Sequence, residues 1–167
     1  MKVYRARAIR GPGTPTFEPL DSRDSVAGPA GWRFNDLGTE ILYAAEVEAL
    51  AALEVAVRPG WETIQQVLIA TIEVPDGAIS DLGDLGIVLP RNWNARPVQE
   101  DSRLIAREFL DAVAALPAGK RKPVGLRVPS VLSSSDYNVL LDPSRRSEYR
   151  AAITGHIPFS TLRTSAS

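Results

Sequence analysis

Hydrophobic and polar positions along the chain predict strands that outnumber two helices. Charged and apolar side chains alternate over residues 2–8, which is typical of a strand, and residues 63–74 are apolar and β-branched enough for a well-buried strand. Apolar residues at helical spacing predict one helix over residues 46–58 and a second that begins at 101 or 102 and ends at 116. Further short strands are expected at 40–45, 123–130, 138–142 and 156–160.

The stretches between these elements predict one domain with two long loops. Residues 11–31 and residues 75–96 are rich in glycine, proline and small polar residues, and a loop as long as the first is often a binding loop or a lid. No repeat and no linker divides the chain. The expected fold class is α+β: a single compact domain with small mixed sheets over residues 1–161 and a frayed tail at 162–167.

Composition narrows the classes of protein. The formal net charge of −1 over 167 residues gives no overall field that would attract nucleic acid or an anionic membrane. No apolar run approaches the ~20 residues that span a bilayer, and the first ten residues lack the core of a signal peptide. The absence of cysteine agrees with a reducing compartment, and the single histidine, His156, rules out a multi-histidine metal site. We therefore expect a cytoplasmic protein without a metal.

Glu54 interrupts the apolar run "ALAALEVAV", residues 49–57. A helix that is apolar on all sides is normally buried, so the pattern predicts a carboxylate carried into the interior. Burying an ionised carboxylate is costly unless it is paired or hydrogen-bonded. Glu54 therefore needs either a structural partner, such as Arg58 one helical turn later, or a function.

Three further residues have both a structural and a functional interpretation. Arg33, in "GWRFN", either packs on Trp32 or offers a guanidinium fork to a phosphate or carboxylate. Tyr43 either fills the core or provides a platform for a flat ring. Ser130 follows a predicted strand and either makes a local turn bond or has a role in a site. A Ser-His-Asp hydrolase built on His156 is disfavoured, because the chain has no G-x-S-x-G elbow.

Six motifs in order resemble the RES-domain family, the toxins of RES–Xre type II toxin–antitoxin modules. They are "VYRARA", "GWRFN", "GTEILYAAE", "ALEVAV", "RVPS" and "YNVLLDP". The arginine, glutamate and serine that name the family match Arg33, Glu54 and Ser130. The chain departs from the family after "GWRFN", where Asp36-Leu37 stand in place of a proline-rich step.

The resemblance implies a fold similar to ADP-ribosyltransferase and diphtheria-type toxins, with NAD⁺ in a cleft between small sheets. It implies NAD⁺ as a substrate rather than a cofactor, cleaved by hydrolysis, by phosphorolysis with phosphate as co-substrate, or by ADP-ribosyl transfer. It also implies an Xre-like antitoxin that blocks the cleft, with nucleic acid contacted only through that partner. The rival expectation is a non-catalytic nucleotide- or partner-binding module with the same fold.

The residues implied for the site suit this chemistry. Cleavage of an N-glycosidic bond passes through an oxocarbenium-like state, which a carboxylate such as Glu54 stabilises. Arg33, with Arg5 as a second basic residue, is expected on the phosphates, Tyr43 on the nicotinamide ring, and Ser130 on the ribose or an incoming phosphate. Asn138 is expected to be a structural clamp on a turn.

Overall fold

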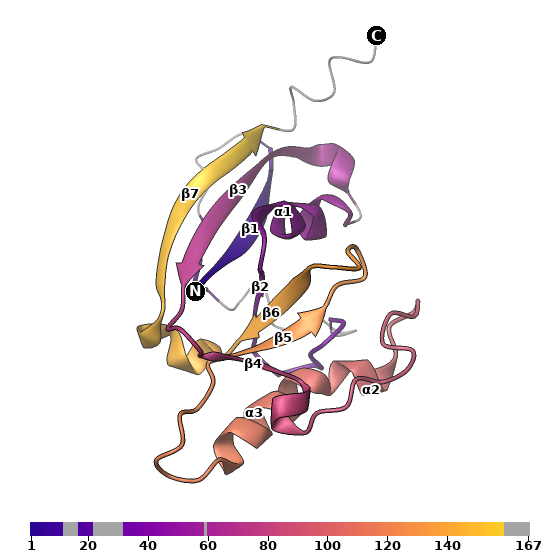
Figure 1. The fold of residues 1–167 in the computed structure, drawn as a ribbon. Helices are drawn as coiled ribbons and strands as arrows, with labels where there is room; N and C mark the ends of the chain where they lie inside the picture. The colour runs from indigo at the N-terminus through magenta and orange to yellow at the C-terminus, as the bar shows by residue number, and fades with distance from the viewer. Residues whose placement is uncertain (12–16, 22–31, 59, 159–167) are drawn as a thin grey trace.

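Seven strands form one mixed sheet in the computed structural model, which describes residues 1–11, 17–21, 32–58 and 60–158 (Figure 1). The sheet order is β4-β5-β6-β2-β1-β3-β7, and all neighbours are antiparallel except β4 and β5. The strands are β1 (Lys2–Arg10), β2 (Leu42–Ala45), β3 (Ile64–Glu73), β4 (Ile79–Asp81), β5 (Gly125–Pro129), β6 (Tyr137–Leu141) and β7 (Arg150–Pro158). The helices are α1 (Glu48–Ala56), α2 (Glu100–Arg103) and α3 (Ile105–Ala115), with short 3₁₀ turns at Trp61–Thr63, Gly83–Leu85 and Pro143–Glu148.

Strand pairing in the sheet is shortest between β1 and β2. These two strands share a single residue pair, Tyr4 with Ala45, whereas β1 pairs with β3 over its whole length. Figure 1 shows the result: β1, β3 and β7 diverge from β4, β5 and β6, and α1 lies in front of the first group. The expected α+β class is confirmed, and the small sheets are the two halves of one sheet.

Each half of the sheet has its own helical cover, while a further buried cluster joins the halves through Val3 and Ile72 on one side and Leu42, Val139 and Leu141 on the other. On the β1–β3–β7 half, α1 packs through Ala52 against Ile64, Val67 and Ile69. On the other half, α3 packs its apolar face against β5 and β6, as its helical spacing predicts. The buried residues of this second core include Phe34, Ile105, Phe109, Val113, Leu126 and Leu140.

Two expectations about the helices are wrong. The first helix is not buried on all sides: Leu53 and Val57 are 41% and 49% exposed, because α1 covers the sheet with one face only. The second helix is broken at Leu104 into α2 and α3. The amide of Ala106 donates to the carbonyl of Phe34 (2.8 Å) instead of to a carbonyl one turn earlier, so a tertiary bond interrupts the helical ladder.

Two strands also differ from expectation. β4 lies inside the stretch predicted as a loop, where it pairs with only three residues of β5. β7 begins at Arg150, six residues before the predicted start, because β3 provides a partner for each end of the longer strand. The predicted tail lies outside the described residues, as does most of the first long loop. No helix in the described ranges is both long and apolar enough to cross a membrane.

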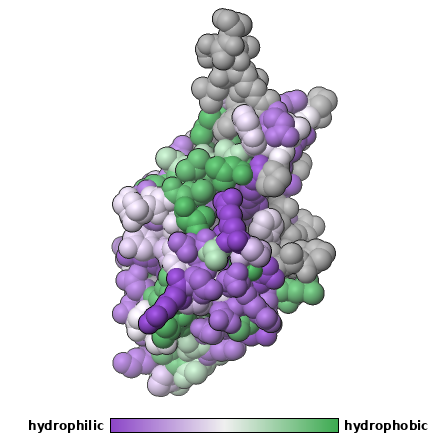
Figure 2. Space-filling model, turned by 90° about the vertical axis from the view of Figure 1, so that its right-hand side faces the viewer, coloured by the Kyte–Doolittle hydropathy of each residue, from purple (hydrophilic) through white to green (hydrophobic). Residues whose placement is uncertain are grey.

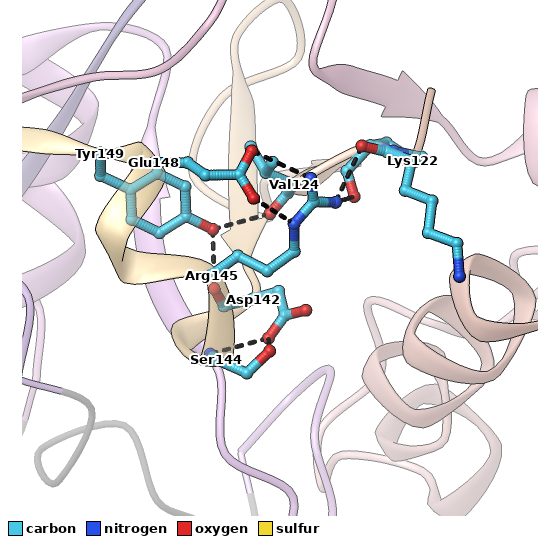
Figure 3. Close-up of polar contacts among 8 residues, drawn as sticks. Lys122, Val124, Asp142, Ser144, Arg145, Glu148 and Tyr149 are labelled. Carbon is cyan, nitrogen blue, oxygen red and sulfur yellow. Dashed lines mark hydrogen bonds and ion pairs between the residues drawn. The ribbon is translucent and has the colours of Figure 1, made fainter. Parts of the chain in front are cut away.

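A polar cluster fixes the ends of β5 and β6 that lie away from α1 (Figure 3). Nη1 of Arg145 donates to the carbonyls of Lys122 and Pro123, both at 2.8 Å, and its Nε and Nη2 bind the carboxylate of Glu148 at 2.7 and 2.9 Å. The hydroxyl of Tyr149 lies 2.7 Å from the carbonyl of Asp142, and burial raises the pKa of Tyr149. We call these residues the Arg145 cluster.

Candidate active site

Glu54 is held by two neutral donors from the opposite half of the sheet. Its Oε1 accepts a hydrogen bond from Oγ of Ser130 (2.9 Å) and another from Nδ2 of Asn138 (2.7 Å). Both donors are almost fully buried. Glu54 comes from α1, Ser130 from the end of β5 and Asn138 from β6. The two donors therefore hold the Glu54 carboxylate across the junction between β1 and β2. We call the three side chains the Glu54 cluster.

The carboxylate of Glu54 does not form an ion pair with Arg58. Nε of Arg58 donates to the main-chain carbonyl of Glu54 (3.2 Å), and its guanidinium carbon lies 4.6 Å from the ring centre of Trp32. The other oxygen of the carboxylate, Oε2, accepts no hydrogen bond from the described residues. Glu54 therefore keeps one oxygen available on the wall of a cavity.

Ser130 makes both a local turn contact and a contact with the site. Its hydroxyl accepts a bond from the amide of Leu132 (3.1 Å), a local turn contact, and donates its one proton to Glu54. It lines a smaller hollow of about 400 Å³ with Trp93 and Ser133, rather than the main cavity. This geometry makes Ser130 a support for Glu54, and its contact with a substrate stays a prediction.

Arg33 is oriented by main-chain carbonyls rather than by an acid. Its Nη1 donates to the carbonyl of Trp93 (2.7 Å) and to that of Ala95 (3.3 Å). Burial lowers the pKa of Arg33, as does the neighbouring Arg96, while Glu54 and Tyr43 oppose the shift. An arginine stays protonated under these conditions, so Arg33 presents a positive charge near Glu54. It does not stack on Trp32, because Arg58 occupies that ring.

Tyr43 anchors the segment that carries Arg33. Its hydroxyl donates to Oδ1 of Asn35 (2.8 Å) and accepts from the amide of Phe34 (3.1 Å), and burial raises its pKa. The carbonyl of Phe34 is in turn held by Ala106 of α3. The ring of Tyr43 lines the cavity, so the residue both supports Arg33 and offers an apolar surface.

The cavity lies beside the junction between β1 and β2. Its volume is about 730 Å³, which is within the range of ligand sites. Among the described residues that line it, Glu54 is the sole carboxylate, against six arginines: Arg5, Arg7, Arg10, Arg33, Arg58 and Arg96. Such a concentration of one sign of charge in a cavity raises the local concentration of anions. The arrangement suits an elongated anionic ligand with one group at the carboxylate.

Arg5 is a buried part of the cavity wall. It is buried, and its Nη1 donates to the carbonyls of Pro19 and Asp21, both at 2.8 Å. These bonds hold residues 17–21 against β1. Arg5 therefore shapes the cavity, and its contact with a phosphate stays a prediction.

Sequence reasoning placed one residue of the Glu54 cluster wrongly. Asn138 lies inside β6, paired with Ala45, and bonds Glu54, so it is not a clamp on a turn. A buried amide near the start of the apolar strand "YNVLLD" is the signal that could have identified it. His156 lies on the edge strand β7, far in sheet order from β5, so it does not meet Ser130. The described ranges hold no group of three or more acidic, histidine or cysteine residues suited to a metal.

Comparisons with known proteins assign the chain to a family. The family model of the RES domain matches residues 2–161. The chain belongs to the RES-domain family. Of the three residues expected from the family name, Arg33 and Glu54 line the cavity, and Ser130 contacts it through its hydrogen bond to Glu54.

Curated relatives of this RES-domain chain are named as toxins. It is 31% identical over 133 residues to the Prs ADP-ribosylating toxin of Sphingobium sp. (strain YBL2), covering 77% of this chain and 76% of that protein. It is 30% identical over 148 residues to Toxin Res of Yersinia enterocolitica, covering 88% and 82%. Toxin Res of Photorhabdus laumondii is 30% identical over 114 residues, covering 68% and 67%.

A solved structure has the same fold. It is that of the MbcT–MbcA toxin–antitoxin complex of M. tuberculosis, with a TM-score of 0.63 at 14% identity, covering 98% of this chain and 88% of the matched one.

Proposed function

We propose that this chain is the toxin of a toxin–antitoxin pair and that it consumes NAD⁺ by breaking the nicotinamide–ribose bond. The observation that carries the proposal is the Glu54 cluster: an oriented carboxylate with a free oxygen in a cavity lined by arginines. The names of the curated relatives, toxins of which one is ADP-ribosylating, support the same conclusion.

The chemistry follows from the charges. In NAD⁺ the bond between the anomeric carbon of the ribose and the ring nitrogen breaks, and its electron pair neutralises the pyridinium. The carbon becomes oxocarbenium-like, and Glu54 stabilises this growing positive charge through the oxygen that the protein leaves unbonded. An acceptor then adds to the carbon and loses a proton where it is water or a protein nucleophile, whereas phosphate adds through an anionic oxygen.

The cations and the aromatic side chain have binding roles in this proposal. Arg33 and Arg5 take the diphosphate, since a guanidinium matches phosphate oxygens bidentately. The ring of Tyr43 meets the nicotinamide. Ser130 and Asn138 act through Glu54, because their donors point to its carboxylate.

The antitoxin is proposed to cover the cavity. Leu53 of α1, Val57 just after the helix and Trp32 expose much of their apolar surface on or near the cavity wall. Figure 2 shows the side of the molecule that carries α1, where an apolar patch lies beside strongly hydrophilic side chains. An exposed apolar patch rimmed by polar residues is typical of a protein-binding site, and a partner seated there would exclude NAD⁺.

Product analysis tests the proposal. Purified protein is incubated with NAD⁺ in the presence and absence of phosphate, with Glu54→Gln as the matched control, and the products are identified by mass spectrometry. We expect the parent to release nicotinamide about 10²-fold faster than the variant, or more, with ADP-ribose, its 1-phosphate or a protein adduct identifying the acceptor. Intact NAD⁺ after incubation with folded parent protein would favour the non-catalytic binding module instead.

A further inference from the structure

A second bridge joins the elements that carry Glu54 and Ser130. At the cavity these two side chains bond each other, and they come from α1 and from the end of β5. Elsewhere, Nη2 of Arg127 in β5 lies 2.7 Å from Oε1 of Glu46, which is two residues before α1. Neither Arg127 nor Glu46 lines the cavity. The same two elements are therefore tied once in the site and once away from it.

The two bridges lie on opposite faces of β5 and β6. Val128, which follows Arg127 in β5, is paired with Asn138, and neighbouring residues of a strand point to opposite faces. Asn138 reaches Glu54 from the face that it shares with Val128. Arg127 projects from the other face, where its guanidinium carbon lies 5.3 Å from the ring centre of Tyr137. Arg127 therefore has no direct contact with the site and can affect it only through the elements that it joins.

Glu46 connects the ion pair to the start of α1. Its amide donates to the carbonyl of Tyr137 (3.0 Å), so its main chain continues the pairing of β2 with β6. The N-cap residue Val47 follows at once, and its hydrocarbon side chain cannot cap the helix. The first turn of α1 is thus positioned by the residue before it rather than by a cap of its own.

The ion pair is only partly buried. The side chain of Arg127 is 35% exposed and that of Glu46 is 20% exposed, and Nη1 of Arg127 also lies 3.5 Å from Asp81 in β4. Water competes for such charges, so the pairing adds little to the free energy of folding. What the pairing does fix is the placement of Glu46 relative to β5, and with it the direction in which α1 leaves the sheet.

We propose that Arg127 is a positioning residue for the reaction. Through Glu46 it sets the start of α1, so that the carboxylate of Glu54 meets its donors on β5 and β6. This inference rests on the proposed role of Glu54 in cleavage of the nicotinamide–ribose bond.

Loss of the ion pair should affect turnover more than binding. A carboxylate that stabilises a growing charge must be held in place before the reaction, and a misplacement of about 1 Å can cost roughly 10²-fold in rate. Removal of a positive charge would by itself favour the growing cation at the ribose. A fall in kcat therefore reports the position of Glu54 rather than the electrostatic field of Arg127.

Steady-state kinetics with NAD⁺ test the proposal. Arg127→Met keeps the length of the side chain and removes its charge, so we expect kcat to fall by about tenfold while KM changes by less than about twofold. Arg127→Lys should recover part of the loss, because an ammonium group can still pair with Glu46. Glu46→Gln breaks the pair from its other side and should reproduce the loss.

Two further variants show whether Arg127 acts through Glu54. Arg145→Met removes an arginine that is also paired with an acid but lies in the Arg145 cluster, and it should leave kcat unchanged. In the Glu54→Gln background, Arg127→Met should lower kcat no further, because the group that it aligns is already gone. An unchanged kcat in Arg127→Met, an equal fall in Arg145→Met, or a full tenfold fall in the Glu54→Gln background overturns the inference.

The side-chain amide of Asn138 reports the alignment without turnover. Its ¹⁵N NMR signal is assigned by its loss in Asn138→Ala, and we expect it to shift in Arg127→Met but not in Arg145→Met. Cleavage of NAD⁺ by the parent with an unmoved signal in Arg127→Met overturns the inference and leaves the proposed function in place. Intact NAD⁺ refutes the proposed function and with it a role of Arg127 in the reaction, whereas the signal still decides whether Arg127 aligns Glu54.

Discussion

The Arg145 cluster and the Glu54 cluster both place a charged side chain among main-chain and polar partners, but they treat that charge differently. The guanidinium of Arg145 is neutralised by Glu148 and its remaining bonds go to two carbonyls (Figure 3). The carboxylate of Glu54 has only neutral donors, both on one oxygen. A charge that the fold compensates stabilises structure, whereas an oriented charge left uncompensated in a cavity is available to a ligand.

The largest expected effect removes the uncompensated charge. Glu54→Gln keeps the volume and an acceptor for Ser130, so we expect a melting temperature close to that of the parent. Turnover of NAD⁺ should fall by about 10²-fold or more, the scale of losing one electrostatic stabiliser of a transition state. Kinetics and thermal unfolding on one preparation check both quantities, and intact turnover would show that Glu54 is only structural.

The converse effect is expected in the Arg145 cluster. Arg145→Ala leaves the carbonyls of Lys122 and Pro123 without their donor and should lower the free energy of unfolding by about 1–3 kcal/mol. Turnover per folded molecule should not change, because the cluster lies away from the cavity lining. Denaturant unfolding measures the first and active-site titration the second; a loss of turnover with unchanged stability would reverse our assignment of the two clusters.

A smaller effect should follow from adding charge to the Glu54 cluster. Asn138→Asp replaces a 2.7 Å donor with a second carboxylate of nearly the same shape. Two neighbouring carboxylates disfavour each other's ionised form, so the pair of carboxylates would bind a proton at higher pH than Glu54 alone. Turnover should therefore fall by about tenfold, and the acid limb of the pH–rate profile should move to higher pH. Asn138→Ala is the matched control: it removes the donor without adding charge and should shift the acid limb less, so an equally large shift in both variants would refute the electrostatic explanation.

The smallest effect concerns the support of Arg33. Tyr43→Phe keeps the ring that lines the cavity but removes the hydroxyl that bonds Asn35 and Phe34. We expect NAD⁺ affinity to fall by about 1 kcal/mol, the typical contribution of a hydrogen bond, with kcat nearly unchanged. Calorimetric titration measures the affinity, and the same affinity in parent and variant would mean that the ring alone matters.

Features that depend on contacts between residues close in sequence could be predicted, whereas features that depend on distant residues could not. Glu54 could be singled out because a carboxylate within an apolar helix conflicts with its own neighbours in sequence. The break at Leu104 could not be predicted, since it depends on the carbonyl of Phe34, some 70 residues earlier in the chain. The partners of Glu54 could not be predicted for the same reason, because Ser130 and Asn138 are 76 and 84 residues away in the chain.

The single bridge between Tyr4 and Ala45 has a mechanical consequence. Glu54 lies on α1, which packs on one half of the sheet, and its two donors belong to the other half, so the alignment of the carboxylate depends on how the two halves are placed. Any change in the relative position of the two halves would therefore misalign Glu54 even where the cavity itself is empty.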